Sequence, residues 1–282
     1  MVFKDRLPGV AILYYMSPPI LVMAACLLAA IGWRIRGRKK LATAFALLAV
    51  ALIWSVPGAS AFRRHDAKPH SLRVLTWNVE GRVRWASQLA EVALRYDPDI
   101  IGLVEAGNSK QRTRRAWQQA FPGYTITRSH GETILLCKKD IASVRTGSAG
   151  SHGVFQHIKV NYDGGFLNII LADVESDPRI SRAATIQELT MVAESLTGPT
   201  LLMGDFNTPA DSVHFQQVRK TFVNAFETCG SGYAATWPMP YPVLHIDHVW
   251  CRDVQIQACE HGWPEFSDHR PVIVHLASPG LK

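Results

Sequence analysis

Two patterns of apolar residues divide this chain into an N-terminal part and a larger C-terminal part. Residues 10–33 and 41–56 form two nearly unbroken apolar runs without a charged side chain. From residue 72 onward, short apolar runs alternate with segments in which apolar residues recur every three or four positions. The first pattern is typical of bilayer-spanning helices, and the second predicts strands and amphipathic helices of a globular α/β domain.

The two apolar runs predict a hydrophobic helical hairpin within residues 1–62. The first run is long enough to span a bilayer, with Pro18-Pro19 as a kink, whereas the second must continue beyond residue 56 to do so. We therefore predict transmembrane helices over about 10–33 and 41–60. The loop 34–40 carries five positive charges, which places it in the cytoplasm by the positive-inside rule. Everything after residue 62 would then lie outside.

Two other interpretations of the N-terminal part stay open. The apolar runs also fit buried core helices of a globular protein. Alternatively, Lys39-Lys40, the second run and Ala59-Ser60-Ala61 imitate a signal peptide with a small-residue cleavage site, which would release the domain that follows. Residues 63–70 are polar and contain a proline, so we interpret them as a linker to one large domain over 71–282.

The alternating pattern of the large domain predicts an α/β sandwich with both parallel and hairpin-connected strands. Strands are expected over 72–77, 99–104, 124–127, 132–137, 154–162, 165–172, 200–206, 244–250 and 271–276, with another near residue 225. Helices are expected over 84–96, 109–120 and 180–196, with a short one after residue 211. Residues 140–153 are expected to connect two strands without forming one.

The positive charge is concentrated at the N-terminus. Residues 1–70 hold ten Lys or Arg and two acids, a net charge of +8, whereas the whole chain carries +7. Residues 71–282 therefore carry −1, which is not the basic excess expected of a domain that grips a nucleic-acid backbone. A local run of Arg112, Arg114 and Arg115 is the exception, and a solvated helix face explains it equally well.

The cysteines predict no zinc site, because their spacing matches no zinc pattern. Cys229, Cys251 and Cys259 fall within one C-terminal region. An extracytoplasmic location would permit a disulfide among them, and we favour Cys229–Cys259 as the pair.

The segment from Leu201 to Pro209 combines a buried strand with polar chemistry. An apolar run ends in Gly204, and Asp205 and Asn207 follow two positions apart. The alternation of a strand would point both side chains to one side of a sheet rim. A carboxylate there can deprotonate a water, and an amide can donate to a phosphate oxygen, although a strand followed by an ordinary turn explains the pair almost as well.

Polar side chains also stand at the ends of four other predicted strands. They are Asn78, Glu105, Asp247 with His248, and Asp268 with His269. Each has an alternative explanation as a cap or turn residue, but Glu105, Asp205 and Asp268 together offer the oxygen ligands that hard divalent cations prefer. Asp247 could hold His269 in one tautomer. The set therefore predicts a hydrolytic metal site.

Five segments, in order, resemble the endonuclease/exonuclease/phosphatase superfamily, the fold of DNase I. They are Thr76-Trp77-Asn78-Val79-Glu80-Gly81, Ile101-Gly102-Leu103-Val104-Glu105, Gly204-Asp205-Phe206-Asn207, Ile246-Asp247-His248 and Ser267-Asp268-His269-Arg270-Pro271. The resemblance covers residues 71–277. It implies a four-layer α/β/β/α sandwich of two mixed sheets and Mg²⁺-dependent cleavage of a phosphoester or phosphoanhydride by an activated water, with Mn²⁺ as a substitute.

The resemblance also implies a role for each matching residue. Metal ligands would be Glu105, Asn78 and Asp268, with Glu80 as an outer ligand. Asp205 would align and deprotonate the attacking water, Asn207 and His269 would stabilise the phosphate, and Asp247 would orient His269.

One position departs from the superfamily pattern. Asp173 follows the strand at 165–172, where many members carry a catalytic His. A carboxylic acid can protonate a leaving group only if its pKa is raised. Either the pKa of Asp173 is raised in this way, or the leaving group needs little help. We interpret Asp173 as a catalytic residue and an activated ester or an anhydride as the substrate.

The layout is also similar to that of the membrane-anchored VanJ-like proteins. This resemblance implies a multi-pass protein of the bacterial cell membrane with an extracytoplasmic catalytic domain and a lipid-linked pyrophosphate substrate rather than nucleic acid. No protein partner is implied. Two other functions stay open: an extracytoplasmic nuclease like DNase I, and an inactive binding module that has kept the fold.

Overall fold

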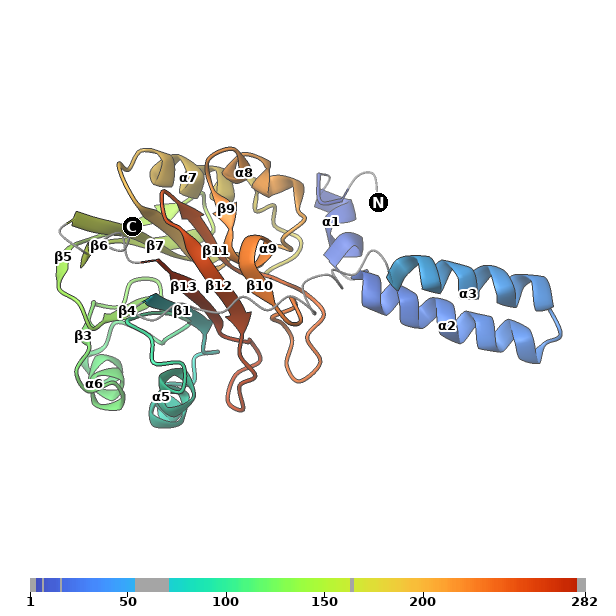
Figure 1. The fold of residues 1–282 in the computed structure, drawn as a ribbon, viewed down its shortest axis with the longest axis horizontal. Helices are drawn as coiled ribbons and strands as arrows, with labels where there is room; N and C mark the ends of the chain where they lie inside the picture. Colours follow the sequence, from blue (N-terminus) through green and yellow to red (C-terminus); the bar gives the residue numbers. More distant parts are fainter. Residues whose placement is uncertain (1–3, 7, 16, 54–70, 163–164, 278–282) are drawn as a thin grey trace.

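The computed structural model describes residues 4–6, 8–15, 17–53, 71–162 and 165–277. The predicted linker 63–70, the end of the second apolar segment and the proposed cleavage site at 59–61 lie outside these residues. Within them, a helical N-terminal part is followed by an α/β domain (Figure 1). The N-terminal part differs most from the sequence prediction.

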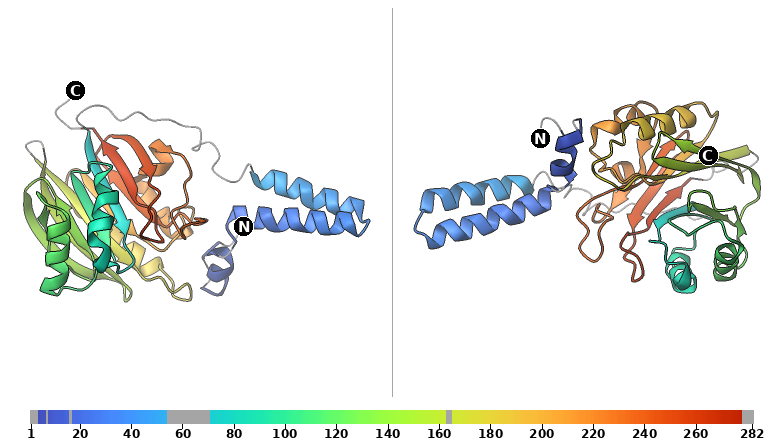
Figure 2. Two further views of the ribbon diagram at one scale, coloured as in Figure 1. Left: turned by 90° about the horizontal axis from the view of Figure 1, so that it is seen from below. Right: turned by 180° about the vertical axis from the view of Figure 1, so that it is seen from behind.

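Three helices form the N-terminal part: α1 (Pro8–Tyr15), α2 (Pro19–Ile35) and α3 (Lys39–Ile53). The expected helix over 10–33 is therefore two helices. Proline lacks an N–H and is tolerated only in the first turn of a helix, so Pro19 begins α2 rather than continuing α1. α2 and α3 lie side by side as a hairpin that projects from the α/β domain (Figures 1 and 2).

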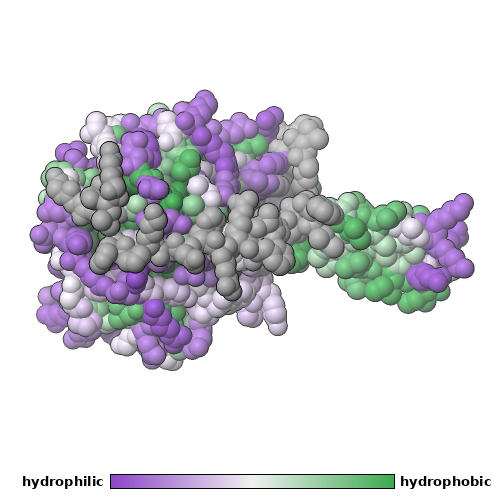
Figure 3. Space-filling model, in the orientation of Figure 1, coloured by the Kyte–Doolittle hydropathy of each residue, from purple (hydrophilic) through white to green (hydrophobic). Residues whose placement is uncertain are grey.

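The surface of this hairpin is apolar along its length and hydrophilic at its tip (Figure 3). The tip is the loop with Arg36, Arg38 and Lys39. In the described part of the chain, none of the helices has both the length and the apolar character needed to cross a membrane. Membrane anchoring by this segment accordingly stays a prediction from the sequence.

Two mixed sheets form the centre of the α/β domain, as predicted. The first has the strand order β10 (Gly230–Ser231), β12 (Ile256–His261), β13 (Val272–Leu276), β1 (Leu72–Asn78), β2 (Ile100–Val104), β4 (Ile134–Cys137) and β3 (Thr125–Ile126). The second has the order β5 (Ile141–Ala149), β6 (Gly153–Tyr162), β7 (Gly165–Val174), β8 (Thr200–Asp205), β11 (Asp247–Arg252) and β9 (Val223–Asn224).

Helices cover the outer faces of both sheets and complete four layers (Figure 1). The first sheet is covered by η1 (Val83–Trp85), α5 (Ala86–Leu94) and α6 (Gln111–Ala120). The second is covered by α7 (Ala183–Glu194), η2 (Val213–Gln216) and α8 (Val218–Thr221), while α9 (Ala225–Cys229) contacts β11 and β12. Each boundary between layers has its own apolar cluster, as this architecture requires.

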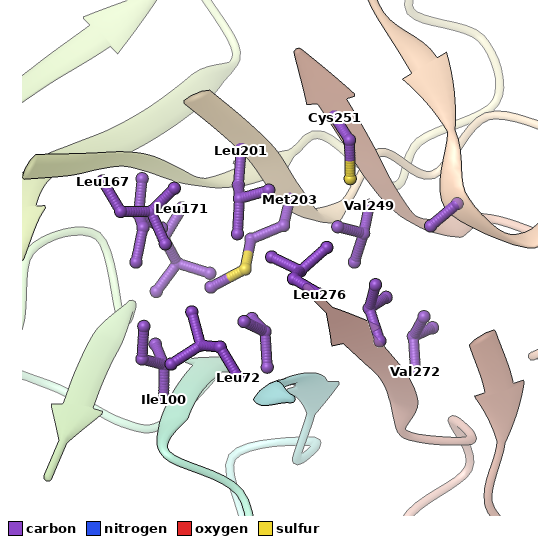
Figure 4. Close-up of a cluster of buried hydrophobic side chains, with 14 of the residues drawn as sticks. Leu72, Ile100, Leu167, Leu171, Leu201, Met203, Val249, Cys251, Val272 and Leu276 are labelled. Carbon is purple, nitrogen blue, oxygen red and sulfur yellow. The ribbon is translucent and has the colours of Figure 1, made fainter. Parts of the chain in front are cut away.

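The central cluster packs the two sheets together (Figure 4). Met203 and Leu171 of the second sheet point toward Leu72 and Ile100 of the first. A side chain on Gly102 of β2 would meet the Met203 methyl group at 2.6 Å, so glycine here lets the sheets approach closely. Side chains that are fully removed from water each contribute about 1.5–3 kcal/mol, so this interface is a principal source of stability.

Two parts of the strand prediction are wrong. The segment 140–153, expected to be a connection, contains β5, whose polar and mostly exposed residues give no apolar signal because it lies at a sheet edge. β12 was missed as well. The strand expected near residue 225 is present as β9, but the helix α9 that follows it was not predicted; the Asn224 side chain accepts hydrogen bonds from the backbone of Phe226 (3.0 Å) and Glu227 (3.1 Å) and caps this helix.

The predicted Cys229–Cys259 disulfide is also wrong. All five cysteines are free thiols. Cys259 is buried in the central cluster, whereas the Cys229 thiol is directed at the carbonyl oxygen of Ile256 at 3.5 Å.

Candidate active site

Strand pairing brings the predicted polar residues to one edge of the sandwich. Asn78 ends β1 and pairs in parallel with Val104, which precedes Glu105. In the second sheet, Asp205 at the end of β8 has Asp173 of β7 on one side and Asp247 of β11 on the other. The register of β7, β8 and β11 therefore places three carboxylates of the second sheet in one row.

Asn78 joins the two sheets at this edge. Its buried amide nitrogen donates to Glu105 Oε1 at 2.8 Å and to Asp205 Oδ2 at 3.0 Å. Glu105 has a φ of +50°, which a non-glycine residue adopts only at a cost, so its position is held against local strain. One side chain thus fixes the separation of the two carboxylates.

His269 and Asp247 form a buried pair beside this cluster. The His269 Nδ1 atom lies 2.9 Å from Asp247 Oδ2, and its Nε2 atom lies 3.8 Å from Asp205 Oδ2. Burial opposes a positive charge on His269, but the negative charges of Asp247 and Asp205 outweigh it and raise the pKa to about 10. The imidazole is therefore protonated at neutral pH, with one N–H held by Asp247 and the other facing the cluster.

Asp205 and Asp173 are both shifted toward the protonated form. Burial, followed by repulsion from Asp247, raises the pKa of Asp205, although the backbone N–H of Asn207 donates to its Oδ1 at 2.8 Å. Burial and repulsion from Asp205 and Glu105 raise the pKa of Asp173 well above its usual value. Asp173 thus meets the condition that an acid at this position must satisfy to donate a proton.

Asn207 lies in the site in a different way from that expected. The strand ends at Asp205, and Asn207 adopts a left-handed φ of +46°, so strand alternation does not set its direction. Its amide nitrogen donates to the carbonyl of Val174 at 2.8 Å and ties the loop after β8 to the end of β7. An amide nitrogen has two N–H donors, so one remains for a phosphate oxygen.

Asp268 carries an unsatisfied buried atom. Its Oδ2 accepts a hydrogen bond from the Trp237 indole at 2.9 Å. Its Oδ1 is buried, lies 3.9 Å from His269 Nε2, and has no hydrogen-bond partner among the described residues. Glu80, the predicted outer ligand, accepts from the Asp268 backbone at 3.3 Å and pairs with Arg82 at 2.7 Å.

The segment that carries this site matches a known protein family. The model of the endonuclease/exonuclease/phosphatase family matches residues 75–269, more than half of the chain. The chain belongs to this family. The match spans Asn78, Glu105, Asp205, Asp247 and His269, so it includes both sheets. No curated protein gives a significant match.

Several solved structures share the fold of this chain at low sequence identity. A functionally unknown protein from Enterococcus faecalis has a TM-score of 0.59 and 17% identity over 73% of this chain and all of its own. TDP2 from D. rerio, complexed with a single-strand DNA product, has a TM-score of 0.61 and 13% identity, covering 74% of this chain and 99% of its own. A mannosyl-6-phosphatase from Bacteroides thetaiotaomicron has a TM-score of 0.58 and 17% identity, covering 73% and 100%.

The donor set in this member of the family fits a divalent cation. Asp205, Asp247 and His269 each place a possible ligand atom within 4.8 Å of the others, and Glu105 is linked to Asp205 through Asn78. This close group differs from the predicted ligands, and the protonated His269 cannot itself bind a metal. The carboxyl groups of Asp205, Asp247 and Asp268 nevertheless all gather around this single histidine, and Asp268 adds the unpartnered oxygen. Excess negative charge with a free oxygen suits a hard cation, for which Glu105, Asn78 and Asp268 remain the predicted ligands.

Sequence reasoning missed the side chains that hold this set in place. The Ser267 hydroxyl donates to the carbonyl of Asn78 at 2.7 Å and accepts from the His269 backbone at 3.0 Å. The Trp77 indole donates to the carbonyl of His269 at 2.8 Å, and the Thr236 hydroxyl accepts from the backbone of Asp247 at 3.3 Å. Ser267 and Trp77 lie within the segments that resemble the superfamily. Thr236 lies outside those segments, and no sequence pattern indicates its role.

A cluster of neutral histidines lies directly behind Asp247. The rings of His245 and His248 are 4.5 Å apart, those of His245 and His261 are 5.1 Å apart, and Phe226 stacks on His261 at 4.2 Å. Burial lowers the pKa of His248 to about 4 and those of His245 and His261 well below the usual value. These histidines therefore stay uncharged in the folded protein at pH values where an unfolded chain would protonate them.

We expect this cluster to destabilise the protein in mild acid. Below pH 6.5 the unfolded state binds more protons than the folded state, so each such histidine costs about 1.4 kcal/mol of unfolding free energy per pH unit. Asp173 and Asp205 titrate in the opposite sense, so the measurement is a difference: urea unfolding at pH 7 and pH 5 for the wild type and His261→Phe. The wild type should lose more stability than the variant, because phenylalanine has no group that the unfolded chain can protonate. Equal losses would contradict this prediction.

Proposed function

We propose that this chain is a metal-dependent hydrolase that cleaves a phosphate ester or anhydride with an activated water. The observation that carries the proposal is the convergence of Glu105, Asp205 and the Asp247–His269 pair at one edge of both sheets. Family membership supports it, since the relatives with named activities include a phosphatase and a protein bound to a DNA product.

The proposed roles follow from the protonation states. Asp205, with its raised pKa, is a base strong enough to accept a proton from water. His269 is cationic and held by Asp247, so its Nε2–H can donate to a phosphate oxygen as negative charge develops. Glu105, Asn78 and Asp268 would hold a Mg²⁺ ion, which when bound stabilises charge on the phosphate as a Lewis acid.

Asp173 is the residue from which we infer the class of substrate. It lies beside Asp205 in the strand register, and burial favours its protonated form. It can therefore donate a hydrogen bond or a proton to the leaving group. We propose an anhydride, specifically a lipid-linked pyrophosphate, as the substrate class. The apolar surface of the α2–α3 hairpin supports the lipid part of this proposal as a membrane anchor, with the domain outside a bacterial cell.

Two substrates and one variant test the proposal on the full chain in detergent with Mg²⁺. We expect hydrolysis of a polyprenyl pyrophosphate to exceed that of plasmid DNA, and Asp205→Asn to reduce turnover by about 10³-fold because the base is lost. Glu91→Gln, on an exposed face of α5, is the matched control and should change nothing. Faster cleavage of DNA would favour the nuclease alternative, and a wild type that hydrolyses neither substrate above background would leave only a binding module.

A further inference from the structure

The segment before the helical hairpin is fastened to the α/β domain through a buried acid. Asp5 is 2% exposed. Its Oδ1 accepts a hydrogen bond from the backbone of Val213 at 3.1 Å, and its Oδ2 accepts one from the Ser212 hydroxyl. The His214 ring lies 3.7 Å away. Burial of a carboxylate costs free energy unless the group is hydrogen-bonded. These contacts therefore form a specific binding position for Asp5 at the start of η2.

Three further side chains of the same segment contact the domain. The Lys4 ammonium pairs with Asp211 at 3.0 Å, and the Tyr14 hydroxyl donates to the same carboxylate. The ring of Tyr15 lies 5.0 Å from the Arg182 guanidinium, in the geometry of a cation–π contact. In Figure 1, α1 lies against the domain, apart from the projecting hairpin. The segment 4–15 therefore meets two separate loops, around Arg182 and at 211–214.

Both loops lead directly into the active site. The Arg182 guanidinium donates to the carbonyls of Glu175 at 3.2 Å and Ser176 at 2.9 Å, and so holds the loop that begins just after Asp173. The other loop follows Asp205 and Asn207 on β8. Asn207 in turn donates to the carbonyl of Val174, so the two loops are already joined at the site.

We propose that residues 4–15 are a positioning latch, which holds the loops after β7 and β8 and thereby keeps Asp173 and Asn207 in place. The chemistry of the site needs these two groups fixed to within a fraction of an ångström. Asn207 stands on irregular backbone beyond the end of β8, and Asp173 is the second-last residue of β7, directly before the loop that Arg182 holds. The contacts also require that residues 4–15 and 71–277 lie in the same compartment, on one side of the α2–α3 hairpin. The activity readout of this inference rests on the proposed function, whereas its exchange readout does not.

Amide hydrogen exchange on the full chain in detergent tests the latch directly. In Asp5→Ala, the backbone N–H of Val213 loses its acceptor, and we expect its hydrogen exchange to become about tenfold faster or more. We expect the same for the backbone N–H of Asn207, which donates to Asp205. Asp5→Asn keeps an acceptor oxygen and should restore most of the protection. Tyr14→Phe removes one hydroxyl and keeps the ring, so it supplies a milder variant if Asp5→Ala does not fold. Glu91→Gln is the control.

Turnover of bis(p-nitrophenyl) phosphate with Mg²⁺ is the second readout. We expect kcat of Asp5→Ala to fall about tenfold while KM changes less than twofold, because positioning rather than binding is lost. Unchanged exchange at Val213 would show that the segment does not dock, and faster exchange at Val213 with unchanged Asn207 protection and kcat would show docking without positioning. Either result overturns the latch. If the wild type itself hydrolyses no phosphoester, the proposed function fails, and exchange at Asn207 still decides the latch.

Discussion

Replacing Glu105 by glutamine is expected to reduce phosphoester hydrolysis by about 10³-fold. The substitution keeps the size of the side chain and removes the charge that a divalent cation needs. The Asn78 amide can still donate to the glutamine oxygen, so the two sheets should stay joined. The measurement is kcat/KM as a function of Mg²⁺ concentration, with the thermal midpoint of unfolding measured in parallel.

The control for this experiment is again Glu91→Gln, which removes the same charge from an exposed position. A Glu105→Gln protein that folds normally and needs more Mg²⁺ for its residual activity would support a ligand role. Full activity with an unchanged Mg²⁺ requirement would show that Glu105 is not a ligand.

Asp247→Asn is expected to cost a similar factor, about 10³-fold at pH 8, through its effect on His269 rather than on substrate directly. Without the carboxylate, the largest interaction that raises the pKa of His269 is lost, and burial lowers that pKa from about 10 against the weaker effect of Asp205 and Asp268. Only the imidazolium brings a positive charge to the phosphate and has an N–H at both ring nitrogens, so the variant should lose activity as pH rises through neutrality while the wild type does not. A pH profile of kcat/KM measures this shift.

The shape of the profile separates this role from a structural one. A merely destabilised protein would lose activity in parallel at all pH values, whereas loss of the charge partner shifts the basic limb to lower pH. Recovery of Asp247→Asn activity at pH 6 would support the orienting role. A profile parallel to that of the wild type would contradict it.

The sequence was sufficient for the elements with strong periodicity. Apolar runs such as that of β8 and the amphipathic pattern of α5 correspond to strands and helices of the structure within a few residues. β5 escaped because an edge strand with one exposed face needs few apolar residues. α9 was not predicted because a five-residue helix is too short to show a periodic pattern, and its start depends on a local cap by the Asn224 side chain.

For the site, the chemistry of each side chain could be read in advance but its partners could not. Glu105, Asp205 and His269 could be selected from the sequence because they stand at the ends of predicted strands. Carboxylates and histidines at such places are candidates for metal binding or catalysis. The bridge made by Asn78 depends on the separation of the two sheets, which no local pattern encodes. The direction of Asn207 depends on a left-handed backbone beyond the strand, so alternation gave the wrong geometry.

The bridge between the sheets ties the chemistry of this enzyme to its architecture. Asn78 and Glu105 come from one sheet, and Asp205 and Asp247 come from the other, so neither sheet alone contains the complete active site. A small slip of one sheet over the other would pull the reacting groups apart while leaving every helix intact. The rate of turnover should consequently be sensitive to the relative position of the two sheets. In mild denaturant it should fall before circular dichroism records any loss of secondary structure.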